Sequence, residues 1–288
     1  MVIGSPRESQ PHEHRVGLTP FLANRLVELG HTVLIEAGAG VAAHFSDGDY
    51  QRAGAQIVYS AEEVYRRSDI VCRVGAVAES EIPLLRPGVT ICSFHHLAVA
   101  PKERVQALMA LGATLVGYEI IRDAAGCLPA LRPMSEMAGQ LAIHVAAHHL
   151  QTERGGRGIL IGHVPGVPPP TVLVLGAGTV GHAAARQATA CGCHVIVVDH
   201  DLQKLARIHA DSEGRVVTAL AGLERLERYT SVADVVVGAI LIPGDRAPFV
   251  VTEKMVEGMK AGSVILDISI DEGGCVETSR PTTLADPT

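Results

Sequence analysis

The residues whose spacing most clearly suggests chemistry are three glycines in the segment 176–181. The segment reads Gly176-Ala177-Gly178-Thr179-Val180-Gly181 and lies between an apolar run, 171–175, and an alanine-rich run, 182–192. A strand followed by such a turn and a helix is typical of dinucleotide binding. The first glycine permits a tight turn, the second lets a pyrophosphate approach the backbone, and the third lets helix and strand pack closely. The helix N-terminus would direct N–H groups and a positive dipole at the phosphates.

The next apolar run ends in an acidic residue, Asp199, at the distance expected for a residue that binds the cofactor's ribose. A carboxylate can accept hydrogen bonds from the ribose hydroxyls, whereas it would repel the 2′-phosphate of NADP. The sequence therefore predicts NAD as the cofactor. The residues predicted to bind it are Gly176, Gly178, Thr179, Val180, Gly181 and Asp199.

Short apolar runs separated by helical patterns must position these residues. Strands are expected at 2–3, 32–36, 56–58, 69–74, 89–94 and 113–118, and again at 171–175, 194–198, 215–218, 233–237 and 263–267. Helical patterns cover 20–29, 61–67 and 102–112, and a long helix, 135–152, links the two halves. Buried strands alternating with helices indicate parallel βαβ units. The predicted fold is α/β, with two doubly wound Rossmann-like domains, 1–132 and 133–288, the second including the linking helix, and a ligand-binding cleft between them.

Composition limits the classes of protein to which this chain can belong. Of its 288 residues, 47% are hydrophobic and 19% charged, which excludes intrinsic disorder. A net charge of −7 and an aromatic content of 3% argue against nucleic acids and anionic membranes as partners. No apolar run reaches the roughly 18 residues of a membrane helix, and the N-terminus has no signal-peptide pattern. Six cysteines without a Cys-x-x-Cys pair indicate free thiols in a reducing compartment, so we expect a cytoplasmic protein.

Several further segments carry a resemblance to a known family. They are Gly4-Ser5-Pro6-Arg7-Glu8, Phe94-His95-His96-Leu97-Ala98, Met134-Ser135-Glu136-Met137-Ala138-Gly139, Asp267-Ile268-Ser269-Ile270-Asp271-Glu272-Gly273-Gly274 and Ser279-Arg280-Pro281-Thr282-Thr283. Over essentially the whole chain, these segments resemble the alanine dehydrogenase and NAD(P) transhydrogenase N-terminal family, and alanine dehydrogenases more closely than transhydrogenases. The resemblance implies an NAD-dependent amino-acid dehydrogenase, which interconverts an L-amino acid with a 2-keto acid and ammonia by hydride transfer. It also implies a homo-oligomer that takes a small amino or keto acid.

The resemblance further implies roles for individual residues. Arg15 would clamp the substrate carboxylate, His96 would act as the acid and base on the substrate, and Asp271 would take part in catalysis near the nicotinamide. Cofactor contacts are implied for Ser135, Lys204, Ile240, Leu241 and Arg280. Ser135 could also cap the N-terminus of the long helix. His95 should face away from the substrate, because adjacent strand residues point to opposite faces.

Two features depart from the family pattern. Family members carry a Lys-x-Lys-Glu-Pro stretch after the fourth strand, whereas this chain reads Cys72-Arg73-Val74-Gly75-Ala76-Val77. Arg73 takes the place of the first lysine, and Gly75 that of the second, which normally contacts the substrate. A larger or cyclic imine is therefore an alternative substrate. The sequence given also lacks the last segment of the family pattern. It could be a natural short form, a fragment, or a chain that another chain completes. A non-catalytic dinucleotide-binding relative is therefore a second alternative.

Two other patterns could in principle form a metal site or a redox site. His144 and His148 have the spacing of a pair of metal ligands on a helix, and His149 follows directly. No acidic residue stands where a zinc protease would need one, so no metal site is predicted. Cys191 and Cys193 flank a glycine, and a turn of small residues accounts for them.

Overall fold

The computed structural model describes residues 1–283 and 286–287. The chain divides into two compact units, Met1–Ile121 (unit 1) and Arg122–Thr288 (unit 2). The predicted boundary near residue 132 lies further along the chain. The loop that precedes the long helix therefore groups with unit 2, whose helix it introduces, and not with unit 1.

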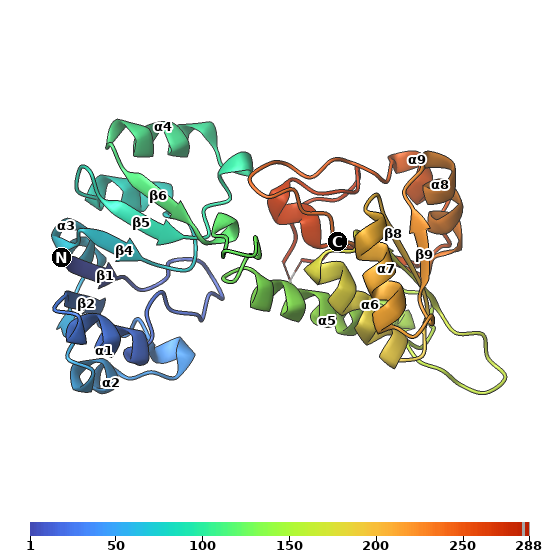
Figure 1. The fold of residues 1–288 in the computed structure, drawn as a ribbon, viewed down its shortest axis with the longest axis horizontal. Coiled ribbons are helices and arrows are strands. Elements are labelled where there is room, and N and C mark those ends of the chain that lie inside the picture. Colours follow the sequence, from blue (N-terminus) through green and yellow to red (C-terminus); the bar gives the residue numbers. More distant parts are fainter. Residues whose placement is uncertain (284–285, 288) are drawn as a thin grey trace. The chain divides into compact units, whose positions relative to one another are not determined.

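Unit 1 is built on one parallel sheet of six strands (Figure 1). The strands are β1 (Val2–Ser5), β2 (Thr32–Glu36), β3 (Gln56–Val58), β4 (Ile70–Cys72), β5 (Thr90–Ser93) and β6 (Thr114–Gly117), in the order β3-β2-β1-β4-β5-β6. The order runs outward in both directions from β1 and β4, so the predicted doubly wound topology is confirmed for this unit.

The helices of unit 1 cover both faces of its sheet. They are α1 (Pro20–Glu28), α2 (Asp47–Arg52), α3 (Ala61–Arg67) and α4 (Lys102–Ala110). Ala23 of α1 and Tyr50 of α2 pack on one face with strand residues such as Ile3, whereas Tyr65 of α3 and Leu108 of α4 pack on the other face. The sequence pattern did not predict a helix at α2. This helix is short and buries one side chain, and a capping box between Ser46 and Asp49 starts it.

Unit 2 repeats the architecture with five parallel strands. The strands are β7 (Thr171–Leu175), β8 (His194–Asp199), β9 (Val217–Leu220), β10 (Val235–Gly238) and β11 (Val264–Asp267), in the order β11-β10-β7-β8-β9. The predicted strand 215–218 begins later than expected. Arg215 and Val216 instead close the turn after the preceding helix, where their N–H groups donate to the backbone and hydroxyl oxygens of Ser212.

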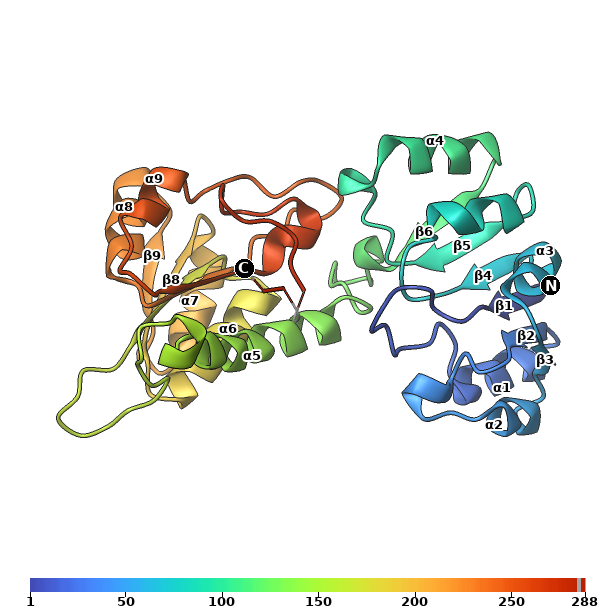
Figure 2. The ribbon, with the colours of Figure 1, turned by 180° about the vertical axis from the view of Figure 1, so that it is seen from behind.

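The helices of unit 2, among its described residues, are α5 (Arg132–His149), α6 (Thr179–Ala190), α7 (Leu202–Asp211), α8 (Leu223–Val232) and α9 (Glu253–Glu257). Figure 2 shows α8 and α9 on the opposite side of the sheet from α5, α6 and α7. The linking helix begins at Arg132, with Pro133 in its first turn, and not at 135. Ser135 is therefore inside the helix, and its predicted role as N-cap is wrong.

Short 3₁₀ helices fill several connections. They are η1 (Val41–Ala43), η2 (Glu79–Leu84), η3 (Leu97–Val99), η4 (Tyr118–Ile120), η5 (Thr152–Arg154) and η6 (Ile268–Glu272). Two of them, η3 and η6, follow the carboxyl ends of β5 and β11 and carry residues singled out from the sequence.

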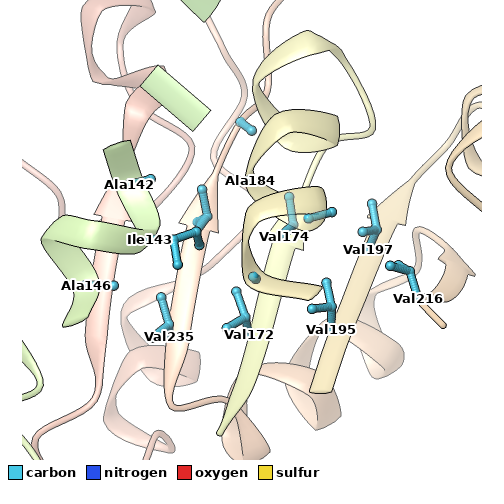
Figure 3. Close-up of a cluster of buried hydrophobic side chains, with 14 of the residues drawn as sticks. Ala142, Ile143, Ala146, Val172, Val174, Ala184, Val195, Val197, Val216 and Val235 are labelled. Carbon is cyan, nitrogen blue, oxygen red and sulfur yellow. The ribbon is translucent and has the colours of Figure 1, made fainter. Parts of the chain in front are cut away.

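One hydrophobic core of unit 2 lies between its sheet and the pair α5 and α6 (Figure 3), and another lies on the opposite face of the sheet. Valines of β7, β8 and β10 point toward Ala142, Ile143 and Ala146 of α5 and toward Ala184 of α6. The two helices approach closely at Gly139, where a Cβ would overlap the carbonyl oxygen of Val180. This contact fixes the start of α6, which follows the glycine-rich turn. Within the residues described, no helix is both long and apolar enough to cross a membrane.

Candidate functional site

The glycine-rich turn joins β7 to α6, and its three glycines meet different surroundings. Gly176 has a φ of +104°, which favours glycine, and a Cβ there would overlap the carbonyl oxygen of Ala239. A Cβ on Gly181 would overlap the carbonyl oxygen of Gly176. Gly178, in contrast, has no heavy atom within 4 Å of an added Cβ. The first and third glycines therefore permit close packing, while the second leaves open space over the backbone.

A cavity of about 810 Å³ opens at this turn, within unit 2. It lies beyond the carboxyl ends of β7 and β10, between which the strand order reverses, and this is where doubly wound sheets bind ligands. Its volume falls in the range typical of cofactor pockets. The cavity is lined by most of the residues predicted to bind the cofactor: Ser135, Gly176, Gly178, Thr179, Val180, Asp199, Lys204, Ile240 and Leu241.

Asp199, at the end of β8, has a fixed carboxylate. Its Oδ2 accepts a hydrogen bond from the N–H of Ala177 at 2.6 Å, and its Oδ1 accepts one from the N–H of Asp201 at 2.8 Å. The residue is buried, and Nδ1 of the exposed His200 lies 3.3 Å from Oδ1. Each carboxylate oxygen has a second lone pair that can accept a further donor. The carboxylate is thus held in place while it keeps acceptor capacity toward the cavity.

Sequence reasoning missed several cationic residues that line the same cavity. His182 and Arg186 lie one turn apart on α6, and Arg207 lies on α7 with Lys204. His182 is held by Asp211, 3.2 Å from its Nε2, and burial lowers its pKa. The signal was available, because positions 179, 182 and 186 share one face of a helix that begins at the turn. Arg186, Lys204 and Arg207 carry the positive charge that favours an anionic ligand in this cavity.

The loop after β10 is positioned from below by a buried serine. Ser269 accepts a hydrogen bond at 2.8 Å from the N–H of Ile240, and Asp267 accepts one from the N–H of Ser269. Asp271 lies two residues further along η6 and is exposed. Arg280 is also exposed, with Nη1 3.9 Å from Asp286. In the part of the chain that the structure describes, neither Asp271 nor Arg280 lines the cavity.

The residues of unit 2 fit a dinucleotide. Open space lies over Gly178, at the start of α6, where no side chain caps the first N–H groups. The fixed carboxylate of Asp199 is placed to accept ribose hydroxyls, and Lys204 lies in the same lining. The apolar walls come from Val180, Ile240 and Leu241. This arrangement can hold a pyrophosphate on backbone donors and a ribose on the carboxylate.

In unit 1, Arg15 lies in the loop after β1 and is half exposed. Its Nε donates to Oε1 of Glu13 at 2.8 Å, and its Nη2 donates to Oε2 at 2.6 Å. This two-point contact has the geometry by which a guanidinium recognises a carboxylate. The hydrogen bonds lower the pKa of Glu13 and raise that of Arg15. Glu13 therefore occupies the guanidinium fork of Arg15 that is predicted to bind a substrate carboxylate.

His96 follows β5, but it is not part of the strand. The strand ends at Ser93, and His96 has a φ of +47° at the start of η3. Glu119 accepts hydrogen bonds from the N–H groups of both His95 and His96, at 3.3 and 2.8 Å. The ring of His96 stacks on Phe94 with centroids 6.2 Å apart. Left-handed backbone and a carboxylate anchor, more than strand alternation, set the direction of this side chain.

His95 is buried. Its Nε2 lies 3.1 Å from the carbonyl oxygen of Ile91, and its Nδ1 lies 3.1 Å from Oγ of Ser93. Burial lowers its pKa. The side chain therefore fastens the end of β5, one residue before His96.

Arg73, in the place of the first family lysine, is fully buried. Its Nη1 donates to Oη of Tyr65 at 2.6 Å and to Oε2 of Glu81 at 2.7 Å, and its Nη2 lies 3.3 Å from Oε2 of Glu8. Burial opposes the charge, but the neighbouring Tyr65, Glu81 and Glu8 keep the pKa of Arg73 raised. Arg73 is thus an internal structural cation. Nothing in the sequence alone separated this role from a ligand contact.

Comparisons with known proteins agree with this geometry. Residues 4–138 match the model of the alanine dehydrogenase/PNT N-terminal domain, and residues 142–288 match that of the alanine dehydrogenase/PNT C-terminal domain. The chain belongs to the alanine dehydrogenase/PNT family. The family resemblance predicted from the sequence is confirmed.

Within the family, the chain is similar to proteins named alanine dehydrogenase. It is 44% identical over its full length to the proteins of that name from Mycolicibacterium smegmatis and Mycobacterium tuberculosis, and covers 77% of each. A solved L-alanine dehydrogenase structure matches the whole chain with a TM-score of 0.88 and 41% identity, and the chain covers 79% of it. A transhydrogenase structure from Sinorhizobium meliloti matches 98% of this chain, which covers 83% of that structure, with a TM-score of 0.79 and 25% identity.

Proposed function

We propose that the chain is an NAD-dependent amino-acid dehydrogenase, which transfers hydride at the carbon–nitrogen bond of an L-amino acid and its imine. The imine exchanges with a 2-keto acid and ammonia. The observation that carries the proposal is the cavity at the carboxyl ends of β7 and β10, with open backbone at Gly178 and a fixed carboxylate at Asp199. Similarity to alanine dehydrogenases over the whole chain supports the same reaction class.

Unit 2 would bind the cofactor. N–H groups at the start of α6 would hold the pyrophosphate, and Asp199 would accept the ribose hydroxyls. Ser135, Lys204, Ile240 and Leu241, which line the same cavity, would contact the rest of the molecule, and the family resemblance adds Arg280. When bound, NAD supplies a hydride acceptor. The carboxylate at residue 199 favours NAD over NADP, because a 2′-phosphate would be repelled.

Unit 1 would bind the substrate. Arg15 would exchange its contact with Glu13 for one with the substrate. The carboxylate of Glu13 and that of the substrate each offer two oxygens to the guanidinium group. His96 would give and take the proton of the substrate's nitrogen or oxygen, for which an imidazole suits neutral pH. Asp271, which the resemblance associates with the nicotinamide end, would assist the interconversion of imine and keto acid.

The first test is a titration of the protein with NADH, followed by the cofactor's own fluorescence, since the chain contains no tryptophan. We expect saturable binding that weakens in Asp199→Ala. His96→Ala should abolish turnover and leave NADH binding unchanged, while His209→Ala, an exposed residue at the end of α7, should change neither. Binding of NADH without turnover of any amino or keto acid would favour a non-catalytic dinucleotide-binding relative. Failure to bind NADH would refute the proposal.

We also propose that the chain forms a homo-oligomer. Met137 and Leu141 lie one turn apart on α5, and both side chains are largely exposed. Apolar residues at this spacing form a stripe that another copy could cover. Light scattering coupled to size exclusion should give a mass above that of the single chain, and a monomer at micromolar concentration would contradict it.

A further inference from the structure

The loops after β1 and β4 meet in unit 1 at the point where its strand order reverses. Glu8, after β1, accepts hydrogen bonds from the N–H of Val74 at 2.6 Å and from the N–H of Gly75 at 3.2 Å. At Gly17 the two loops approach so closely that a Cβ would overlap the backbone of Cys72. The switch point of a doubly wound sheet is its usual ligand site. The side chains that line these two loops should therefore determine what unit 1 binds.

Gly75 lies at this junction and, as a glycine, supplies no charged side chain there. The residue is half-buried, and an added Cβ would lie 3.2–3.3 Å from Cδ, Nε2 and Oε1 of Gln10. Three nearly equal distances mean that the face of the Gln10 amide is turned toward the position that a Cβ on residue 75 would take. The φ of Gly75 is outside the positive region, so its backbone does not require glycine. A neutral amide, with one acceptor and two donors, takes the space of a side chain at residue 75.

The guanidinium of Arg73, two residues before Gly75 in the chain, cannot replace a cation at residue 75. The guanidinium of Arg73 is buried and contacts Tyr65, Glu81 and Glu8. Its positive charge therefore lies in the interior of unit 1. Arg15 is paired with Glu13. The charged side chains around the junction and the neighbouring His96 loop include three guanidinium groups, Arg15, Arg73 and Arg104, and four carboxylates, at Glu8, Glu13, Glu81 and Glu119. The excess of carboxylates favours a ligand that carries positive charge of its own.

This charge balance bears on which form of substrate can react. Attack of ammonia on a keto group builds negative charge on oxygen, which a nearby cation must stabilise. A protonated imine needs no such help, because its C=N bond already carries the positive charge. In the hydride step, the new C–H bond forms at the Cα while the π electrons of C=N move to nitrogen. NADH is oxidised to NAD⁺, the iminium becomes a neutral amine, and that amine then takes a proton from solvent.

We propose that this chain reduces preformed imines, of the class of cyclic imino acids, and that the pair Gln10 and Gly75 determines this specificity. The amide of Gln10 occupies the space that a side chain at residue 75 would take, and its oxygen accepts a hydrogen bond from the iminium N–H. The product is a cyclic secondary amino acid. The inference rests on the proposed function, since the hydride step is the same, and it narrows the substrate class.

The test compares two reactions of the full chain with NADH: pyruvate plus ammonium, and a five- or six-membered cyclic imine carboxylate. We expect kcat/KM for the cyclic imine to be at least about tenfold higher. A preference for pyruvate plus ammonium, or equal values, would overturn the inference and leave the proposed dehydrogenase standing. NADH binding with turnover of neither substrate would instead refute the proposed function, and the inference with it.

Two variants test the assigned pair directly. Gln10→Ala should raise KM for the cyclic imine severalfold, without changing NADH affinity. Gly75→Lys should shift the ratio of kcat/KM values toward pyruvate plus ammonium by at least about tenfold, because it places an ammonium where the keto oxygen needs one. Gly48→Lys, the same change on α2 of unit 1, should leave the ratio unchanged. An unchanged ratio in Gly75→Lys, with NADH affinity intact, would overturn the assignment.

Discussion

The two sheets of this protein share a topology, but their switch points are built by different means. In unit 2 the turn after β7 relies on backbone: three glycines, a helix N-terminus and a single fixed carboxylate. In unit 1 the corresponding junction relies on side chains, with Arg73 buried between carboxylates and Gln10 lying over Gly75. Backbone binding suits a constant ligand such as a dinucleotide. Side-chain binding leaves the identity of the second ligand open to single substitutions.

The largest expected effect comes from the buried ions of unit 1. Arg73→Met leaves Glu8 and Glu81 buried without their cation, and should cost about 3–5 kcal/mol of free energy of unfolding. Amide hydrogen exchange should locate the loss in β4 and β5, while unit 2 keeps its protection and NADH affinity. Arg67→Met breaks the exposed pair with Glu63 and should cost less than about 1 kcal/mol. Equal loss of protection in both units would contradict the separation drawn here.

The next largest effects are expected for two glycines of unit 2. Gly181 is needed for packing, whereas Gly178 leaves space for a ligand. Gly181→Ala should both destabilise unit 2 and weaken NADH binding by at least about tenfold, because its Cβ overlaps the Gly176 carbonyl. Gly178→Ala should weaken NADH binding to a similar extent and leave the free energy of unfolding within about 0.5 kcal/mol. Gly222→Ala, which also has no atom within 4 Å of its Cβ, is the control and should change neither quantity. Binding unaffected by Gly178→Ala would argue against a pyrophosphate at this turn.

A smaller effect follows from the pKa of His95, which burial lowers. Between its pKa in the folded state and the ordinary value near 6.5, the unfolded chain binds more protons than the folded chain. The free energy of unfolding of unit 1 should therefore fall as pH falls below about 6.5, by at most about 1.4 kcal/mol per pH unit. Hydrogen exchange of β5 at several pH values measures this fall, and His95→Gln should reduce its slope. The exposed His209→Ala should not alter it.

The smallest expected effect concerns the thiols of unit 1. Cys72 and Cys92 are partners in the register of β4 and β5, and a hydrogen bond from Cys72 lowers the pKa of Cys92 to about 7. The rate of alkylation of Cys92 should rise as pH increases through about 7. In Cys72→Ala the rise in alkylation rate should occur at higher pH. Peptide mass mapping measures the alkylation of each cysteine. Cys275, buried in unit 2 with a pKa raised to about 12 chiefly by burial, should stay unmodified in both proteins.

Much of this architecture could be predicted from the sequence, because its signals are local. Continuous apolar runs located the central strands, and the glycine spacing with Asp199 located the cavity of unit 2. The predicted ends of helices were less accurate. The long helix was expected to begin at Ser135, but Pro133 already lies in it. The junction of unit 1 was out of reach, because Glu8 and Arg73 are 65 positions apart and their pairing depends on the sheet order. The same holds for Gln10, which meets Gly75 only after β1 and β4 become neighbours.

Asp199 has a consequence for the kinetics of ligand exchange. Its carboxylate is tied to two backbone N–H groups before any ligand arrives, so the rotamer entropy of this side chain is lost during folding and not during binding. A ligand that meets a group already in position needs no conformational step to be recognised there. Association at this end of the cavity should therefore proceed in a single phase, linear in ligand concentration, and departure of the ligand should leave a receptor ready for the next molecule.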